Sequence, residues 1–253
     1  MAHRLAYILC ATPRSGTTML CDLLSATGQA GRPQSYFRRQ DIGARARAWG
    51  LRIEDFEDER EFNRAYLQRV LDEGAGGTGI FGIRLMWGTV EEVVERLGWL
   101  HLGAPADQLF KKIFGRVVYI HVSRADKLAQ AISLLKAEQS GLWHVFADGS
   151  PRQKTAAQAA SGYDARRIKQ LMQELENDDT AWRSFFLKHA ISPVMTNYEA
   201  LAARPREEVG KILEALGLPS ALAEEVTVQT SKMADAESAQ WAERFSREQT
   251  DLE

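Results

Sequence analysis

Cysteine is scarce in this chain: only Cys10 and Cys21 occur among 253 residues. This scarcity excludes a disulfide framework, and the two cysteines do not form the CxxC pair that many structural metal sites use. Both lie among apolar residues. We therefore expect two buried thiols that behave as small hydrophobic side chains.

Long hydrophobic runs are also missing. The apolar segment Leu5–Ala11 is much shorter than the ~20 residues that cross a membrane. It is followed by Pro13 and Arg14, where a signal peptide would have a cleavage site of small residues. We expect no membrane span, interpret Leu5–Ala11 as a buried first strand, and expect the protein to be cytoplasmic.

Neither sign of charge dominates, because 32 Lys and Arg residues face 34 Asp and Glu residues, for a net charge of −2. A large basic face for nucleic acid is therefore not expected, whereas a local pocket for a small anion is compatible with this balance. A hydrophobic content of 45% and a charged content of 26% are typical of a folded globular chain. The length suits one domain over residues 1–253.

Strand patterns alternate with helix patterns along the chain. This alternation predicts an α/β fold in which a central parallel sheet is flanked by helices. The segment Gly31–Trp49 contains five arginines and is predicted to be a loop. The predicted strands are Leu5–Ala11, Ile80–Leu85, Arg116–Val122 and Pro193–Thr196, and the predicted helices are Thr17–Ala26, Phe56–Glu73, Thr89–Leu100, Ala125–Leu142, Tyr163–His189, Pro205–Leu216 and Ser238–Gln249.

The segment Thr12–Thr18, which we call the phosphate turn, joins the first strand to the first helix and reads TPRSGTT. The first N–H groups of a helix lack partners and its dipole favours anions. Gly16 allows close approach of the backbone, and Arg14 and the hydroxyl groups add donors. These features predict binding of a phosphate or sulfate group. The alternative is an ordinary loop in which Ser15 or Thr17 only caps the helix.

The phosphate turn is not the P-loop of nucleoside triphosphatases, whose pattern is G-x-x-x-x-G-K-[ST]. The first glycine and the lysine of that pattern are absent, and Arg14 stands before Gly16 instead. A magnesium-dependent kinase of the P-loop type is therefore the less favoured alternative, because its main phosphate-binding residue is missing.

A second pair of polar residues follows the strand Arg116–Val122. Arg124 stands at the end of this strand and Ser133 nine residues later, about two and a half helical turns on. Since ligands of parallel sheets bind beyond the carboxyl ends of the strands, both side chains could converge on one phosphate. Alternatively, Arg124 makes only a surface ion pair.

Together these features resemble sulfotransferases that use 3′-phosphoadenosine 5′-phosphosulfate (PAPS), and most of all the bacterial trehalose 2-sulfotransferase-like family. The resemblance implies a P-loop-like sulfotransferase fold, PAPS as co-substrate, adenosine 3′,5′-bisphosphate (PAP) as product, no metal, a small hydroxylated acceptor such as a carbohydrate, and a possible homodimer. Besides the phosphate turn and the Arg124–Ser133 pair, it rests on Ala26–Gln34, Arg84–Trp87, Ile120–His121, Trp143 and Gln240–Arg244.

The resemblance also implies roles for single residues. Sulfuryl transfer is a loose, in-line reaction that depends on positioning and charge stabilisation. Arg14 is expected to stabilise the bridging oxygen as the nucleotide leaves, and Arg84 is a weaker candidate for contact with the sulfuryl oxygens. The implied cofactor-binding residues are Arg14, Ser15, Gly16, Thr17 and Thr18 for the 5′-phosphosulfate, Arg124 and Ser133 for the 3′-phosphate, and Lys232 for a late loop that closes on the cofactor.

The acceptor side departs from the family pattern. Where relatives carry a Glu that serves as the base, this chain has Ser35, which cannot do so at neutral pH. Three explanations stay open: another base, an acidic or anionic acceptor held by nearby arginines, or nucleotide binding without turnover. The candidate bases are Asp41, Glu138 and His144, and the predicted acceptor site comprises Arg32, Ser35, Arg38 and Arg39.

Three aromatic residues have two interpretations each. His121 lies near the end of a predicted strand, where it is either a buried structural residue or a catalytic one. Trp87 and Trp143 either stack on a sugar or adenine ring or pack in the core.

Overall fold

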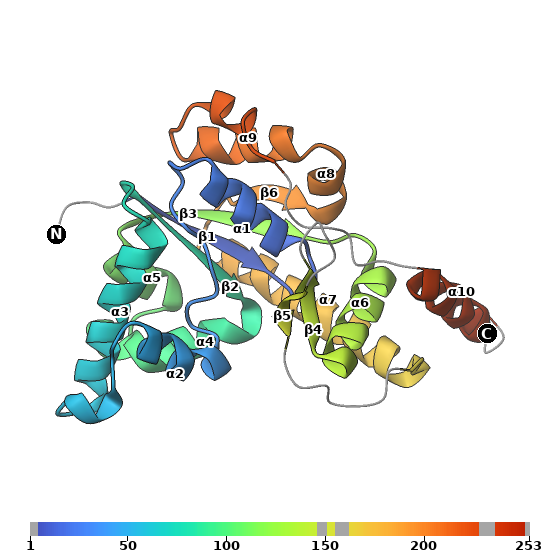
Figure 1. The fold of residues 1–253 in the computed structure, drawn as a ribbon, viewed down its shortest axis with the longest axis horizontal. Coiled ribbons are helices and arrows are strands. Elements are labelled where there is room, and N and C mark those ends of the chain that lie inside the picture. Colours follow the sequence, from blue (N-terminus) through green and yellow to red (C-terminus); the bar gives the residue numbers. More distant parts are fainter. Residues whose placement is uncertain (1–4, 146–150, 155–161, 228–235, 251–253) are drawn as a thin grey trace.

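The computed structural model describes residues 5–145, 151–154, 162–227 and 236–250. Within them, four strands form one parallel sheet in the order β2-β1-β3-β6. The α/β fold class expected from the sequence is therefore confirmed, with a central parallel sheet between layers of helices (Figure 1). The strands are β1 (Leu5–Ala11), β2 (Ile80–Met86), β3 (Arg116–Ser123) and β6 (Val194–Asn197).

Strand β1 lies in the middle of the sheet, between β2 and β3, and it is buried on both faces. Ile8 and Cys10 point into one hydrophobic cluster, whereas Tyr7 and Leu9 point into another. This is the arrangement that a continuous apolar run requires, because neither set of side chains faces water.

The two clusters correspond to two layers of helices, above and below the sheet in Figure 1. The Tyr7 face packs against a small group of helices and the Ile8 face against a larger one. The first group is α1 (Thr17–Ala26), α8 (Tyr198–Ala203) and α9 (Pro205–Ala215), and the second is α3 (Glu59–Ala75), α4 (Trp87–Leu97), α5 (Ala106–Phe114) and α7 (Ala165–Lys188).

A third hydrophobic cluster joins α6 (Lys127–Ser140) and α7 to α10 (Ala236–Thr250), which lies at one end of the molecule (Figure 1). Between α6 and α7 the chain forms an antiparallel pair, β4 (Leu142–Val145) and β5 (Pro151–Lys154), which the sequence did not predict. In the described part of the chain, every helix is too short or too polar to cross a membrane.

The prediction of a loop over Gly31–Trp49 was wrong for its second half, which forms helix α2 (Arg39–Ala48). Ile42 and Ala46 lie one turn apart and are buried, so they attach the helix to the core. The charges also suit a helix, with Asp41 in the first turn and arginines in the last. Helices α5 and α8 were not predicted, nor were the short 3₁₀ segments Ile53–Asp55 and Ser220–Ala223. The end of the predicted helix Thr89–Leu100 forms a 3₁₀ segment, Gly98–His101.

The strand order creates a switch point beside β1. The chain passes from β1 to β2 on one side and then returns to β3 on the other side of β1. In parallel sheets, ligands bind beyond the carboxyl ends of the strands at such a point. The phosphate turn leaves β1 there and Arg124 follows β3, so the fold brings these two segments to one edge.

Candidate functional site

The phosphate turn is a tight connection that needs glycine at one position. Gly16 directly precedes α1 with φ of +81°, in the left-handed region. A Cβ atom built on Gly16 would lie 2.7 Å from Cδ2 of Tyr198, which is closer than any real contact. Both the conformation and the close packing therefore require glycine here.

The first turn of α1 has no side chain that would neutralise the positive end of the helix dipole. Its first turn contains no acidic residue, and Gly16 provides no side-chain cap. Thr17 is buried there, and the Ser15 hydroxyl donates to the Thr12 carbonyl at 2.8 Å, which closes the turn on itself. A helix start without a carboxylate favours an incoming anion.

Three residues that the sequence placed in the site lie in contact although they are far apart along the chain. Arg14 Nε donates to Ser133 Oγ at 2.9 Å, over a separation of 119 residues. Arg124 Nη1 donates to the Arg14 carbonyl at 3.2 Å. The Arg14 guanidinium also donates to the Trp143 carbonyl, which follows α6. The turn, the end of β3 and α6 therefore meet at one place.

This place is strongly positive. Burial, together with the charge of Arg124, lowers the pKa of Arg14 to about 10, so Arg14 stays charged at neutral pH. The Arg124 guanidinium lies 4.4 Å from the ring centre of Tyr198. The Nε of Arg124 is buried without a hydrogen-bond partner among the described residues. Two adjacent, partly buried arginines and an unsatisfied N–H suit an anion with several oxygens.

Arg84 connects this site to the segment that the sequence assigned to the acceptor. It lies on β2, next to β1 in the sheet. Its Nη1 donates to Thr18 Oγ1 and its Nε to Ser35 Oγ, each at 2.9 Å. One guanidinium thus spans from the first turn of α1 to Ser35.

The other three predicted acceptor residues differ in their surroundings. Arg38 lies 5.4 Å above the Trp143 ring and 3.4 Å from Asp41. Arg32 is 3.9 Å from Glu73 of α3, with 60% of its side chain exposed. Arg39 forms ion pairs with two glutamates of α4 and is 70% exposed. Only Arg38 contacts a residue, Trp143, that also binds Arg14.

Two of the three candidate bases, Asp41 and Glu138, have side chains that the structure describes. Asp41 faces Arg38, and Glu138 is paired with Arg167 at 3.1 Å. The side chain of His144 and the whole of Lys232 lie outside the described residues. Within the described ranges, no group of three or more metal-ligating side chains occurs.

Two aromatic residues have the surroundings of core residues. Trp87 packs edge-on against Trp182 with ring centres 5.0 Å apart. His121 is 1% exposed and lies against Phe186, so it is buried inside the sheet layer.

The sequence did not predict two further residues, Gln130 and Tyr198, that contact the phosphate turn. Gln130 donates to the Thr12 hydroxyl at 2.9 Å and to the Pro13 carbonyl at 2.6 Å. Tyr198 packs against Gly16 and Arg124. Tyr198 could have been found, because it follows β6 directly at the same sheet edge. Gln130 carried no signal, because a glutamine on a helix is usually solvent-exposed.

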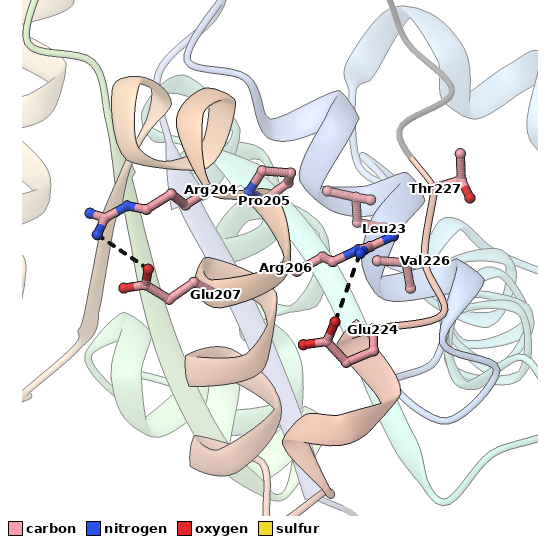
Figure 2. Close-up of a pocket in the computed structure, with 8 residues that line it drawn as sticks. All are labelled: Leu23, Arg204, Pro205, Arg206, Glu207, Glu224, Val226 and Thr227. Carbon is pink, nitrogen blue, oxygen red and sulfur yellow. Dashed lines mark ion pairs between the residues drawn. The ribbon is translucent and has the colours of Figure 1, made fainter.

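A cavity of about 670 Å³ lies between α1, the start of α9 and the segment after Ala223 (Figure 2). Its arginines pair with neighbouring glutamates, Arg204 with Glu207 at 3.2 Å and Arg206 with Glu224 at 3.8 Å (Figure 2). No residue of the phosphate turn lines it. It is therefore separate from the site described above.

Comparison with known proteins points to one family. A family model described as Stf0 sulphotransferase matches residues 6–248. The trehalose 2-sulfotransferase of Mycolicibacterium smegmatis is 30% identical over 264 residues, which cover 97% of this chain and 96% of that protein. The trehalose 2-sulfotransferase of Mycobacterium tuberculosis is 27% identical over 260 residues, with coverage of 96% and 94%. Among solved structures, the sulfotransferase domain from the Synechococcus PCC 7002 olefin synthase aligns over 97% of both chains, with 13% identity and a TM-score of 0.37.

Proposed function

Because the chain belongs to the Stf0 sulphotransferase family and is therefore an enzyme, a transferase, we propose that it transfers the sulfuryl group of PAPS to a hydroxyl of a small acceptor. The observation that carries this proposal is the meeting of Arg14, Arg124 and Ser133 at the phosphate turn. Three separate segments supply positive charge and one unpaired N–H donor, the Nε of Arg124, at the carboxyl edge of the sheet. Such a site suits an anionic nucleotide.

We assign the two ends of the nucleotide to two different parts of the site. The start of α1 and Gly16 would hold the 5′-phosphosulfate, because that helix end offers backbone N–H groups without a carboxylate. Arg124 and Ser133 would hold the 3′-phosphate. The unsatisfied Nε of Arg124 supports this assignment. Ser133 accepts from Arg14 and can still donate its own hydroxyl proton to a phosphate oxygen.

PAPS supplies an activated sulfuryl group when it is bound. The protein then has to align the groups and stabilise charge on the leaving oxygen. Arg14 suits this role, because its guanidinium is held rigidly by Ser133 and by the Trp143 carbonyl. We assign Arg84 to the oxygens of the transferred sulfuryl group, and its bonds to Thr18 and Ser35 support this assignment.

For the acceptor, we propose a carbohydrate or another hydroxylated metabolite bound beside Ser35, Arg38 and Trp143. The two mycobacterial relatives are named for trehalose, which makes that disaccharide the first acceptor to test. Indole rings stack well on sugars, and the Trp143 ring lies under Arg38 near the donor site. Asp41 is a possible base among the described residues, although Arg38 pairs with it.

We also propose that residues 1–253 act as one sulfotransferase domain, since the family model covers residues 6–248. A homodimer and a cytoplasmic location stay predictions. Family membership favours turnover over simple nucleotide sensing, and it favours PAPS over the nucleoside triphosphate that a kinase would use.

Thermal unfolding with added nucleotides tests the donor. A ligand at 100 times its Kd stabilises by about 2.7 kcal/mol, so PAP should raise the Tm by roughly 5–10 °C, whereas ATP with Mg²⁺ should not. A shift with ATP and Mg²⁺ but not with PAP would contradict the proposal. Turnover of labelled PAPS with trehalose and a panel of neutral and anionic sugars then tests the acceptor, and no product with any of them would favour a nucleotide-binding protein without turnover.

A further inference from the structure

The phosphate turn is supported from inside the molecule by a buried glutamine. Gln130 lies on α6 and is fully buried, as is Thr12. The side-chain amide nitrogen of Gln130 donates to the Thr12 hydroxyl at 2.9 Å and to the Pro13 carbonyl at 2.6 Å. A buried amide that makes two bonds to one turn restrains the orientation of that turn.

The direction of the Gln130 amide is set by a partly buried ion pair between Lys127 and Asp179. Lys127 Nζ donates to Gln130 Oε1 at 3.2 Å. The same ammonium group pairs with Asp179 of α7, whose side chain is completely buried. Because an ammonium group can only donate, it holds the oxygen of the amide, and the amide NH₂ must then face the turn. His121 lies 3.8 Å from the other Asp179 oxygen, which is too far for a hydrogen bond.

The consequence for the turn follows from peptide geometry. In a planar trans peptide the C=O and N–H groups point in opposite directions. Gln130 holds the Pro13 carbonyl toward the interior, so the N–H of Arg14 points to the opposite side. Arg14 has φ of +63°, a conformation that is unfavourable for a residue with a side chain and persists only when its surroundings impose it.

We propose that Gln130, oriented by Lys127 and Asp179, is a positioning residue that aims the backbone N–H of Arg14 at the 5′-phosphate subsite. This inference rests on the proposed function, because it assumes that the 5′ group binds at the phosphate turn. Gln130 itself does not touch the ligand. Its effect passes through the Pro13–Arg14 peptide.

Calorimetric titration with two nucleotides separates this role from a merely structural one. In the Gln130→Glu variant an oxygen replaces the donor, while Lys127 keeps a partner. The Kd for PAP should rise about tenfold, since one or two hydrogen bonds to an anionic group are weakened. The Kd for adenosine 3′-monophosphate, which lacks the 5′-phosphate, should change by less than about twofold. Equal losses for both nucleotides, or no loss for either, would overturn the inference.

Further variants distinguish a selective loss of PAP binding from a general loss of folding. Lys127→Met should reproduce the PAP-selective loss and Lys127→Arg should restore PAP binding, because arginine can also bind both Asp179 and the amide oxygen. Val70→Ala, which removes buried atoms of α3 from the core, should lower the Tm without changing the ratio of the two Kd values. If the wild-type protein bound PAP no better than adenosine 3′-monophosphate, the proposed function would fail instead.

Discussion

At the scale of single residues, the two arginines of the candidate site, Arg14 and Arg124, differ in their contacts. Arg14 is held by Ser133 and by the Trp143 carbonyl, which leaves its guanidinium little freedom. Arg124 binds the turn through the Arg14 carbonyl and keeps one buried N–H unsatisfied. A fixed charge suits a transition state, whereas an unsatisfied donor suits ground-state binding.

Replacing Arg14 should therefore affect catalysis more than binding. In Arg14→Ala, we expect kcat to fall about 100-fold or more and the Kd for PAP to rise less than tenfold, because the lost charge acts mainly on the leaving oxygen. Initial rates with PAPS and calorimetry with PAP measure the two effects. Arg69→Ala, at an exposed position of α3, is the matched control. Normal turnover in Arg14→Ala would show that its role is misassigned.

Replacing Arg124 should have the opposite profile. Arg124→Ala should raise the Kd for PAP by about 10- to 100-fold, the range expected for a lost charged hydrogen bond. The Kd for 5′-AMP should change much less, since that nucleotide has no 3′-phosphate. Competition binding with both nucleotides measures the difference. Equal weakening of PAP and 5′-AMP would remove Arg124 from the 3′-phosphate subsite.

At the scale of elements, the junction between β1 and α1 depends on its backbone. Gly16 has a left-handed φ and lies directly against the Tyr198 ring, so its position couples the helix start to β6 and α8. Helix α1 then packs through Leu20, Leu23 and Leu24 on the Tyr7 face of the sheet. The N-terminal end of α1, where we propose that the anion binds, is therefore attached to the sheet and packed against the Tyr198 ring.

Gly16→Ala should lower both stability and nucleotide binding. The added Cβ meets Tyr198 and also makes the left-handed conformation unfavourable, for a combined loss of about 2–4 kcal/mol in the free energy of unfolding. Gly28→Ala provides the matched control, because Gly28 has φ of +66° but no atom within 4 Å of the added Cβ. It should lose only about 1–2 kcal/mol. Urea unfolding of both variants measures this, and equal losses would mean that the Tyr198 contact does not matter.

At the scale of the whole molecule, a net charge of −2 conceals a separation of charge. Arg14, Arg84 and Arg124 gather at the carboxyl edge of the sheet around one proposed anion site. Elsewhere, two buried carboxylates, Glu92 and Asp179, are paired with cations. Glu92 of α4 binds Arg39 and Arg96, and Asp179 binds Lys127 beneath the phosphate turn.

These buried carboxylates predict that the protein loses stability in acid. Burial tends to raise the pKa values of Asp179 and Glu92, but His121 and Lys127 for Asp179, and Arg39 and Arg96 for Glu92, lower them below their ordinary values. The unfolded state therefore takes up protons first as the pH falls. The stabilisation is complete above the ordinary carboxyl pKa of about 4 and disappears as the pH falls through the lower folded values.

The urea midpoint should accordingly decrease between pH 5 and pH 3, within the ordinary titration range of carboxylates near ~4. Asp179→Asn should be less stable at neutral pH and show a smaller decrease in acid. Glu54→Gln, at an exposed position, is the control that should follow the wild type. A wild-type midpoint independent of pH over this range would contradict the prediction.

Much of the architecture followed from the sequence alone. All four strands of the parallel sheet and the phosphate turn were predicted, because apolar runs and the chemistry of a strand-to-helix turn are local signals. The α/β class and the resemblance to sulfotransferases followed from the order of these local signals along the chain. Helix α2 was not predicted, because only Ile42 and Ala46 form its apolar face and its arginines make the segment resemble an exposed loop.

Only the tertiary structure decided which polar residues meet. It joined Arg14 to Ser133 and Arg84 to Ser35, and it paired Arg32 and Arg39 with glutamates of α3 and α4. It also brought Gln130 beneath Pro13, 117 residues away in the sequence. Such contacts depend on how helices pack on the sheet, and no local pattern of residues encodes that packing. The sequence by itself determined the four strands of the sheet and the phosphate turn, whose signals are local, and the packing decided which charged and polar side chains surround that turn.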